Sequence, residues 1–89
     1  MAWKIDFDER AVEEIEDLDR PIQRRVVTYL ENRVLAADDP RRLGNLLQGE
    51  RSGLWRYRVG DYRVVCRVDQ TNQTILVLRI GHRRNVYRR

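Results

Sequence analysis

The spacing of the apolar residues changes partway along this 89-residue chain, and the change restricts the fold to one class. Up to about residue 38, apolar residues recur every three or four positions, as on a helix with one buried face. From Leu54 onward they alternate with polar residues, which is the pattern of half-buried strands. Helices followed by a run of strands predict an α+β fold, in which the helices cover one face of a small, mainly antiparallel sheet.

The first half predicts a strand and two helices. Residues 3–7 alternate apolar and polar side chains, as a strand does. Asp8 is suited to cap the N-terminus of a first helix, and Pro21 is tolerated in the first turn of a second helix, which is expected to end at residues 38–40. Because so few residues join the helices, we expect an antiparallel hairpin. Its predicted buried face consists of Ala11, Ile15, Leu18, Ile22, Val26, Leu30 and Val34.

The second half predicts three more strands after a segment, residues 41–53, that is expected to be mostly loop. The strands are expected at residues 54–59, 62–68 and 75–80. Gly60-Asp61 fits a two-residue turn of type II′, because glycine comes first. The last strand is nearly all apolar, which is typical of a central strand covered on both faces. The predicted order is β-α-α-β-β-β, in one domain that spans residues 1–89.

Positive charge is concentrated in the second half and is almost entirely arginine. The chain has 18 Lys and Arg, of which only Lys4 is a lysine, against 14 Asp and Glu. Residues 46–89 contain 10 basic and 3 acidic side chains, whereas residues 1–45 contain 8 and 11. This distribution favours a surface for a polyanion such as nucleic acid. It equally suits a sheet that needs a polar face toward solvent, and composition alone does not separate the two alternatives.

Strand parity places several arginines on the face that the helices leave open. Side chains alternate between the two faces of a strand, so the arginines of the predicted hairpin lie opposite its aromatic and apolar residues. Guanidinium groups bind phosphate oxygens in pairs and remain charged, so this face is a candidate phosphodiester site. Parity places Arg56, Arg58 and Arg63 there. Arg83, which follows the last strand, is expected to curl over the same surface, with Arg67 and Arg79 at its rim.

Aromatic residues near this face are candidates for stacking on unpaired bases, as in the recognition of single-stranded RNA. Tyr87 in the basic tail is one, and Trp55 is another if it is not buried. Parity assigns Tyr57 and Tyr62 to the core instead. His82, taken alone, is more typical of a surface or hinge residue than of a catalytic one.

The scarcity of some residue types argues against several other chemistries. A single cysteine, Cys66, cannot form an intrachain disulfide, and one cysteine with one histidine cannot build a structural zinc site. Ser52 is the only serine and has no histidine placed beside it, which argues against a hydrolase triad. No apolar run approaches the ~20 residues of a membrane span, and the N-terminus lacks a signal-peptide core. We therefore expect a protein of the reducing cytoplasm that uses no metal and no cofactor.

Four stretches of the chain carry a resemblance to a known family. They are Ile5-Asp6-Phe7-Asp8-Glu9-Arg10-Ala11, Leu47-Gln48-Gly49, Tyr62-Arg63-Val64-Val65 and Gly81-His82-Arg83-Arg84-Asn85-Val86-Tyr87. Together they resemble the RelE toxins of bacterial and archaeal toxin–antitoxin systems, within the RelE/ParE superfamily, nearly from end to end. The resemblance implies a RelE-like fold and a metal-independent endoribonuclease, or mRNA interferase, that enters the ribosomal A site and cuts the mRNA there, inhibiting translation.

The resemblance also implies roles and partners. The family attacks with the RNA's own 2′-hydroxyl in a basic site. Carried over by position, that site contains Arg56, Arg58, Arg63, Arg83 and Tyr87. Apart from the resemblance, we predict Arg67, Arg79 and Arg84 as further RNA contacts. The implied partners are a cognate antitoxin, the ribosome and mRNA, with operator DNA bound through the antitoxin complex and no membrane.

One departure from the family pattern concerns the group that accepts the proton of the RNA 2′-hydroxyl. The best-studied members have lysines where this chain has Arg56 and Arg58, and an arginine cannot act as a general base. The proton of the 2′-hydroxyl is then expected to go to Tyr87 or His82. Two other functions stay open: a ParE-like toxin that inhibits DNA gyrase without catalysis, and an inactive toxin that serves as an antitoxin-bound co-repressor.

Overall fold

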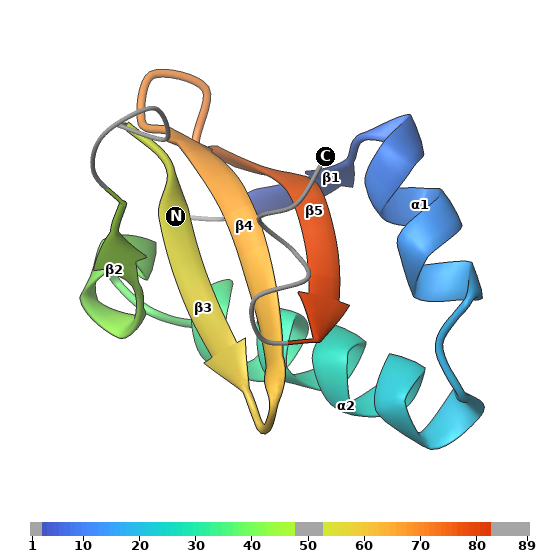
Figure 1. The fold of residues 1–89 in the computed structure, drawn as a ribbon. Helices are drawn as coiled ribbons and strands as arrows, with labels where there is room; N and C mark the ends of the chain where they lie inside the picture. The colour runs from blue at the N-terminus through green and yellow to red at the C-terminus, as the bar shows by residue number, and fades with distance from the viewer. Residues whose placement is uncertain (1–2, 48–52, 83–89) are drawn as a thin grey trace.

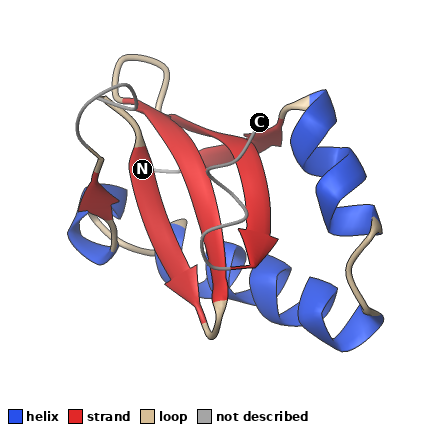
Figure 2. Ribbon diagram, viewed as in Figure 1, coloured by secondary structure: helices blue, strands red, loops and turns tan. Residues whose placement is uncertain are grey.

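The computed structural model describes residues 3–47 and 53–82, which form two helices and a five-stranded sheet (Figures 1 and 2). The helices are α1 (Glu9–Glu16) and α2 (Arg20–Tyr29), and α2 continues into a π-helical turn, Leu30–Val34. A short 3-10 helix follows at Pro40–Leu43. The strands are β1 (Lys4–Phe7), β2 (Asn45–Leu46), β3 (Trp55–Val59), β4 (Tyr62–Asp69) and β5 (Thr74–His82).

The strand order in the sheet is β1-β5-β4-β3-β2. β1 runs parallel to β5 and pairs with its first half, from Lys4 opposite Thr74 to Phe7 opposite Val77. The other neighbouring strands are antiparallel, as predicted. Gly60 leads the β3–β4 turn with a φ of +61°, whereas Asp61 keeps a negative φ. This combination fits the predicted type II′ turn and excludes type I′, which needs a positive φ at both residues.

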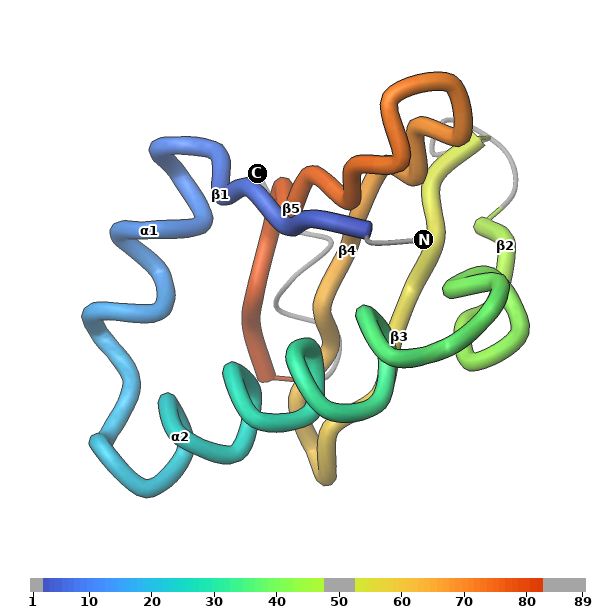
Figure 3. Tube along the Cα trace, turned by 180° about the vertical axis from the view of Figure 1, so that it is seen from behind, coloured from blue at the N-terminus to red at the C-terminus, as the bar shows by residue number. Residues whose placement is uncertain are grey.

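The two helices leave their short connection in different directions, so they contact different parts of the sheet. α1 contacts β5 and β1, whereas α2 runs across the rear of the sheet and contacts β3 (Figures 1 and 3). The predicted antiparallel hairpin is therefore splayed, because each helix packs against the sheet. No helix in the described part of the chain is long and apolar enough to cross a membrane.

The core lies between the helices and one face of the sheet. The helical residues predicted to be buried by their spacing are found there: Ala11, Val26, Leu30 and Val34 are almost fully buried. Strand parity also correctly predicted that Tyr57, Val59, Val64 and Cys66 face this core. β5 adds Ile75, Val77 and Ile80, for which the sequence predicted only a continuous apolar run. Trp55 is half-buried and packs against this cluster, so it is not an exposed stacking platform.

The segment predicted to be mostly loop contains two short elements that the sequence pattern did not reveal. The 3-10 helix begins after Asp39, whose side chain accepts a hydrogen bond from the backbone N–H of Arg41 at 3.0 Å. The buried hydroxyl of Tyr57 donates to the carbonyl of Pro40 at 2.8 Å. Leu46 then pairs with Trp55 to place β2 beside β3. The contact of Tyr57 with Pro40 and the pairing of Leu46 with Trp55 join residues that are not neighbours in the chain, so the local periodicity does not predict them.

A bulge in β5 changes which of its residues face the core. Val65 lies opposite Arg79 and Cys66 opposite Val77, so Leu78 has no direct partner on β4. Strict alternation from Ile75 would turn residue 79 toward the helices. The extra residue shifts the alternation, so that Arg79 turns away and Ile80 enters the core.

Candidate functional site

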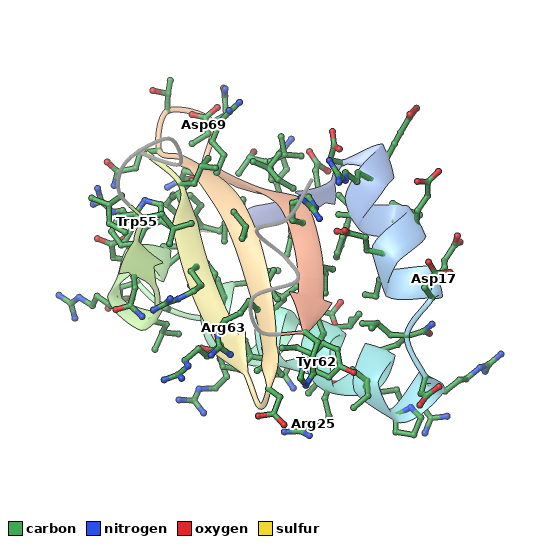
Figure 4. All side chains as sticks on the ribbon, viewed as in Figure 1. Asp17, Arg25, Trp55, Tyr62, Arg63 and Asp69 are labelled. Atoms are coloured by element: carbon green, nitrogen blue, oxygen red, sulfur yellow. The ribbon has the colours of Figure 1, made fainter. Side chains whose placement is uncertain are left out.

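Three arginines from the β3–β4 hairpin come together on the face of the sheet opposite the core. Arg58 on β3 lies directly opposite Arg63 on β4, and Arg56 lies opposite Val65 on the same face. Arg67, two residues beyond Val65 on β4, continues the row. We call Arg56, Arg58, Arg63 and Arg67 the arginine face. Figure 4 shows Arg63 on the side of the sheet turned toward the viewer.

The pairing of Arg58 with Arg63 sets two like charges opposite each other. Side chains directly opposite in an antiparallel pair have Cβ atoms about 4.5–5.5 Å apart, and like charges there destabilise the sheet. Arg63 donates one hydrogen bond, from Nη1 to the carbonyl of Tyr62 at 3.3 Å. Within residues 3–47 and 53–82, neither guanidinium has an ion pair with a carboxylate. A bound anion would therefore relieve their repulsion.

Arg56 has a buried donor without an acceptor. Its side chain is half-buried, and its Nε atom is buried with no hydrogen-bond partner. Leaving a buried donor unsatisfied costs roughly 1–3 kcal/mol, more when the group is charged. A phosphate oxygen would supply the missing acceptor once the side chain turns this nitrogen outward. Arg56 and the Arg58–Arg63 pair thus favour the same ligand chemistry for two different reasons.

Arg79, which was expected at the rim of the arginine face, is held in an ion pair. Its Nε donates to both carboxylate oxygens of Glu14 on α1, at 3.2 and 3.0 Å. The same carboxylate accepts a hydrogen bond from the backbone N–H of Ile80 at 2.8 Å. The structure therefore ties this guanidinium to α1, and its charge is already paired, which argues against the predicted contact of Arg79 with RNA. The sequence did not reveal this ion pair because 65 positions separate its members.

His82 lies on the opposite side of the sheet from the arginine face. It pairs with Tyr62, which is the chain neighbour of Arg63 and therefore points the other way. The two rings meet edge to face, with centroids 5.2 Å apart (Figure 4 labels Tyr62). The bulge in β5 is the physical cause, because strict alternation would have put residue 82 beside the arginines. The described residues do not bring His82 together with the groups it was predicted to serve.

The remaining predicted site residues, Arg83, Arg84 and Tyr87, lie outside the described residues. Cys66 and Tyr57 are fully buried, and burial raises the pKa of both side chains well above the ordinary values. Neither is an exposed nucleophile. Among the described residues, no group of three His, Cys, Asp or Glu side chains is arranged to hold a metal ion.

Comparison with known proteins decides the family. Residues 5–87 match the family described as the ParE toxin of type II toxin–antitoxin systems, parDE. The chain belongs to this toxin family. Toxin RelG of Mycobacterium tuberculosis (strain ATCC 25618 / H37Rv) is 36% identical over 76 residues, which cover 74% of this chain and 87% of RelG. The chain is therefore a RelE-type toxin of the RelE/ParE superfamily.

Solved structures confirm the predicted RelE-like fold of this toxin. A chain of the RelBE2 toxin–antitoxin complex of Mycobacterium tuberculosis matches with a TM-score of 0.85 and 28% identity, covering 93% of this chain and 100% of that one. A mutant of the E. coli toxin RelE in the free state matches with a TM-score of 0.78 and 28% identity, covering 98% and 92%.

One further feature of this RelE-type toxin was missed at the level of sequence. A groove of about 640 Å³ lies between α2 with its π-helical turn and the end of β3 with the β3–β4 turn. Four arginines line it: Arg24, Arg25, Arg33 and Arg58. Helical spacing correctly placed Arg24 and Arg25 on an exposed face. Helical spacing does not show that the tip of a hairpin more than 30 residues later forms the opposite wall of the groove.

Proposed function

We propose that this toxin is a metal-independent endoribonuclease that cuts mRNA on the ribosome and so inhibits translation, with residues 1–89 acting as one toxin domain in the cytoplasm. The observation that carries the proposal is the arginine face. Arg58 and Arg63 repel each other, and Arg56 has a buried donor without an acceptor. The non-bridging oxygens of one phosphodiester group would relieve both conditions.

In the proposed reaction, the 2′-hydroxyl oxygen of one nucleotide attacks the adjacent phosphorus. The bond from phosphorus to the 5′-oxygen of the next nucleotide breaks, which leaves a 2′,3′-cyclic phosphate and a 5′-oxyanion that takes a proton from water to become a 5′-hydroxyl. Arg56, Arg58 and Arg63 hold the phosphate and stabilise the charge that develops on its oxygens. Arg83 is proposed to stabilise the same charge or the leaving oxygen, and Arg67 and Arg84 to contact the RNA on either side.

The acceptor of the 2′-hydroxyl proton is proposed to be Tyr87. An arginine side chain stays protonated, so Arg56 and Arg58 cannot take this role. His82 is the weaker candidate, because its ring packs against Tyr62 on the other side of the sheet. The tyrosine oxygen has both donor and acceptor capacity, and in its phenolate form it would accept the proton.

Mapping RNA ends in a translation extract tests the proposal. The parent protein should cut a translated message and leave the same RNA intact when ribosomes are absent. Arg63→Ala should slow cutting by about 10²–10³-fold, as expected when a group that stabilises developing charge is removed. Arg10→Ala, an exposed arginine on α1, is the matched control and should cut like the parent. Equal cutting by Arg63→Ala and the parent would remove Arg63 from the site.

The family match itself favours a second candidate, inhibition of DNA gyrase without catalysis, because the matching family is named for the ParE toxins. A supercoiling assay with purified gyrase separates the two. Inhibition of supercoiling, with messages left intact, would replace the nuclease proposal.

A cognate antitoxin is proposed as the neutralising partner, because relatives of this chain were solved in toxin–antitoxin complexes, RelBE2 among them. Operator DNA is proposed to be bound through that complex. A toxin that neither cuts messages nor inhibits gyrase, yet strengthens operator binding by its antitoxin, would be an inactive co-repressor.

A further inference from the structure

The groove between α2 and the β3–β4 turn has the chemistry of an anion site. Its arginines come from both walls: Arg24, Arg25 and Arg33 from the helical side, and Arg58 from the end of β3. The described residues that line it include no Asp or Glu. Within residues 3–47 and 53–82, none of the four guanidinium groups forms an ion pair or side-chain hydrogen bond. Four unpaired cations around one concave surface create a local positive potential that concentrates polyanions.

Arg25 connects the two walls of the groove. Its guanidinium lies against Gly60 in the β3–β4 turn, with one nitrogen 3.0 Å from the position that a Cβ atom would occupy there. Figure 4 shows Arg25 beside the tip of the hairpin. A side chain at position 60 would push this guanidinium away, and the φ of +61° disfavours one as well. The turn glycine therefore lets a helix arginine close one end of the groove.

Arg58 belongs to the groove and to the arginine face at the same time. It lies opposite Arg63 on the sheet and also lines the groove. β2 pairs with Trp55 and Arg56, and beyond Arg56 the outer edge of β3 has no strand partner among the described residues. A continuous row of guanidinium groups thus runs from the sheet, around the free edge of β3, to α2.

We propose that this groove is a second RNA-backbone subsite, which binds phosphodiester groups of the strand that continues beyond the arginine face. The inference rests on the proposed function, because it extends the same RNA path. Thr28 and Asn32 add a hydroxyl and an amide between the arginines, and both groups can donate to phosphate or to a ribose hydroxyl. The RNA proposed to supply this backbone is the message, and binding of ribosomal RNA in its place is an outcome that the test distinguishes.

The test compares two double variants that remove the same charge. Arg24→Gln/Arg33→Gln removes two groove arginines, whereas Arg10→Gln/Arg20→Gln removes two exposed arginines elsewhere. Binding is measured over a range of salt concentrations to two probes: a short single-stranded RNA with 2′-O-methyl riboses, which has no attacking hydroxyl, and ribosomes without message. Each lost single-strand phosphate contact lowers the slope of log affinity against log salt by about 0.7.

The groove variant should lose about 1.4 from that slope, and the control variant should keep the parent slope. A change with the short RNA assigns the groove to the message, and a change with ribosomes alone assigns it to ribosomal RNA. Equal slopes for both variants with both probes would overturn the inference. Unchanged RNA binding with weakened antitoxin binding would also overturn it and make the groove an acidic-protein surface. Because binding is measured without cleavage, a parent that cuts no message refutes the proposed function separately.

Discussion

The carboxylate of Glu14 on α1 accepts a hydrogen bond from the backbone N–H of Ile80, 2.8 Å away, in the half of β5 that β1 leaves unpaired. The same carboxylate binds Nε of Arg79. A helix side chain therefore takes the place of a neighbouring strand at the open edge of the sheet. It protects an edge that would otherwise present unpaired backbone groups.

Removing this carboxylate should destabilise the fold. Glu14→Ala leaves the N–H of Ile80 and the guanidinium of Arg79 without their acceptor, so we expect a loss of about 1.5–3 kcal/mol, as for hydrogen bonds to charged groups. Glu14→Gln keeps one acceptor and should lose less. Urea denaturation measures both, with Glu13→Ala, an exposed neighbour on the same helix, as the control. A parent-like midpoint for Glu14→Ala would show that the edge contact contributes nothing to stability.

Tyr57 lies so close to Gly44 that a side chain at position 44 is expected to clash with its ring. A Cβ atom at position 44 would lie 2.9 Å from Cε1 of Tyr57 and 3.1 Å from the carbonyl oxygen of Arg56. Tyr57 is fully buried and its hydroxyl is held by Pro40, so its ring has little freedom to move. Gly44→Ala should therefore cost about 1–3 kcal/mol of folding free energy, as overpacking does.

A double-mutant cycle checks the cause of that cost. Adding Tyr57→Leu to Gly44→Ala should recover part of the loss, because the clashing ring atoms are gone. Strict additivity of the two changes in denaturation would show that the alanine acts elsewhere.

Arg58 is proposed to bind RNA, but its position opposite Arg63 is expected to lower the stability of the fold. Arg58→Gln should raise the free energy of unfolding in low salt by about 0.2–1 kcal/mol, because it removes the like-charge contact across β3 and β4. The gain should shrink in about 1 M salt, where the screening length falls to about 3 Å. Thermal and urea denaturation at both salt concentrations measure it. Arg67→Gln, whose partner on β5 is Leu76, should show no such gain.

Asp39 predicts a specific dependence of stability on pH. The side-chain hydrogen bond from Arg41, then the one from its backbone N–H, hold the pKa of Asp39 below its ordinary value of 3.8. A lowered pKa in the folded state means that the unfolded chain takes up the proton first as the pH falls. The contribution of Asp39 to stability is then complete above about pH 5 and disappears as the pH drops through the folded-state pKa.

Asp39→Asn should therefore show a flatter loss of stability than the parent between about pH 5 and pH 2. Denaturation curves over this range, with the exposed neighbour Asp38→Asn as the control, measure the difference. Identical pH profiles for the parent and Asp39→Asn would contradict the assignment.

Local pattern was enough to predict most of the secondary structure and the face of the sheet on which the hairpin arginines lie. The alternation of Arg56 and Arg58 with buried residues depends only on strand geometry, so their face was predictable before any contact was known. The helix start at Asp8 was predictable for the same reason, since its side chain accepts from the N–H of Arg10 two residues later. β2 was not predictable, because it depends on pairing with Trp55 nine residues beyond Leu46.

The sequence by itself determined the α+β class, the buried faces and the concentration of arginine on one side of a hairpin, because each depends on residues a few positions apart. Tertiary structure decided which cationic side chains are available to bind an anion. The bulge in β5 turned His82 away from the arginines, and Glu14 bound Arg79 across 65 positions. Packing α2 behind β3 joined Arg24 and Arg25 to Arg58 in one groove. These outcomes depend on strand register and helix placement, which only the folded chain establishes.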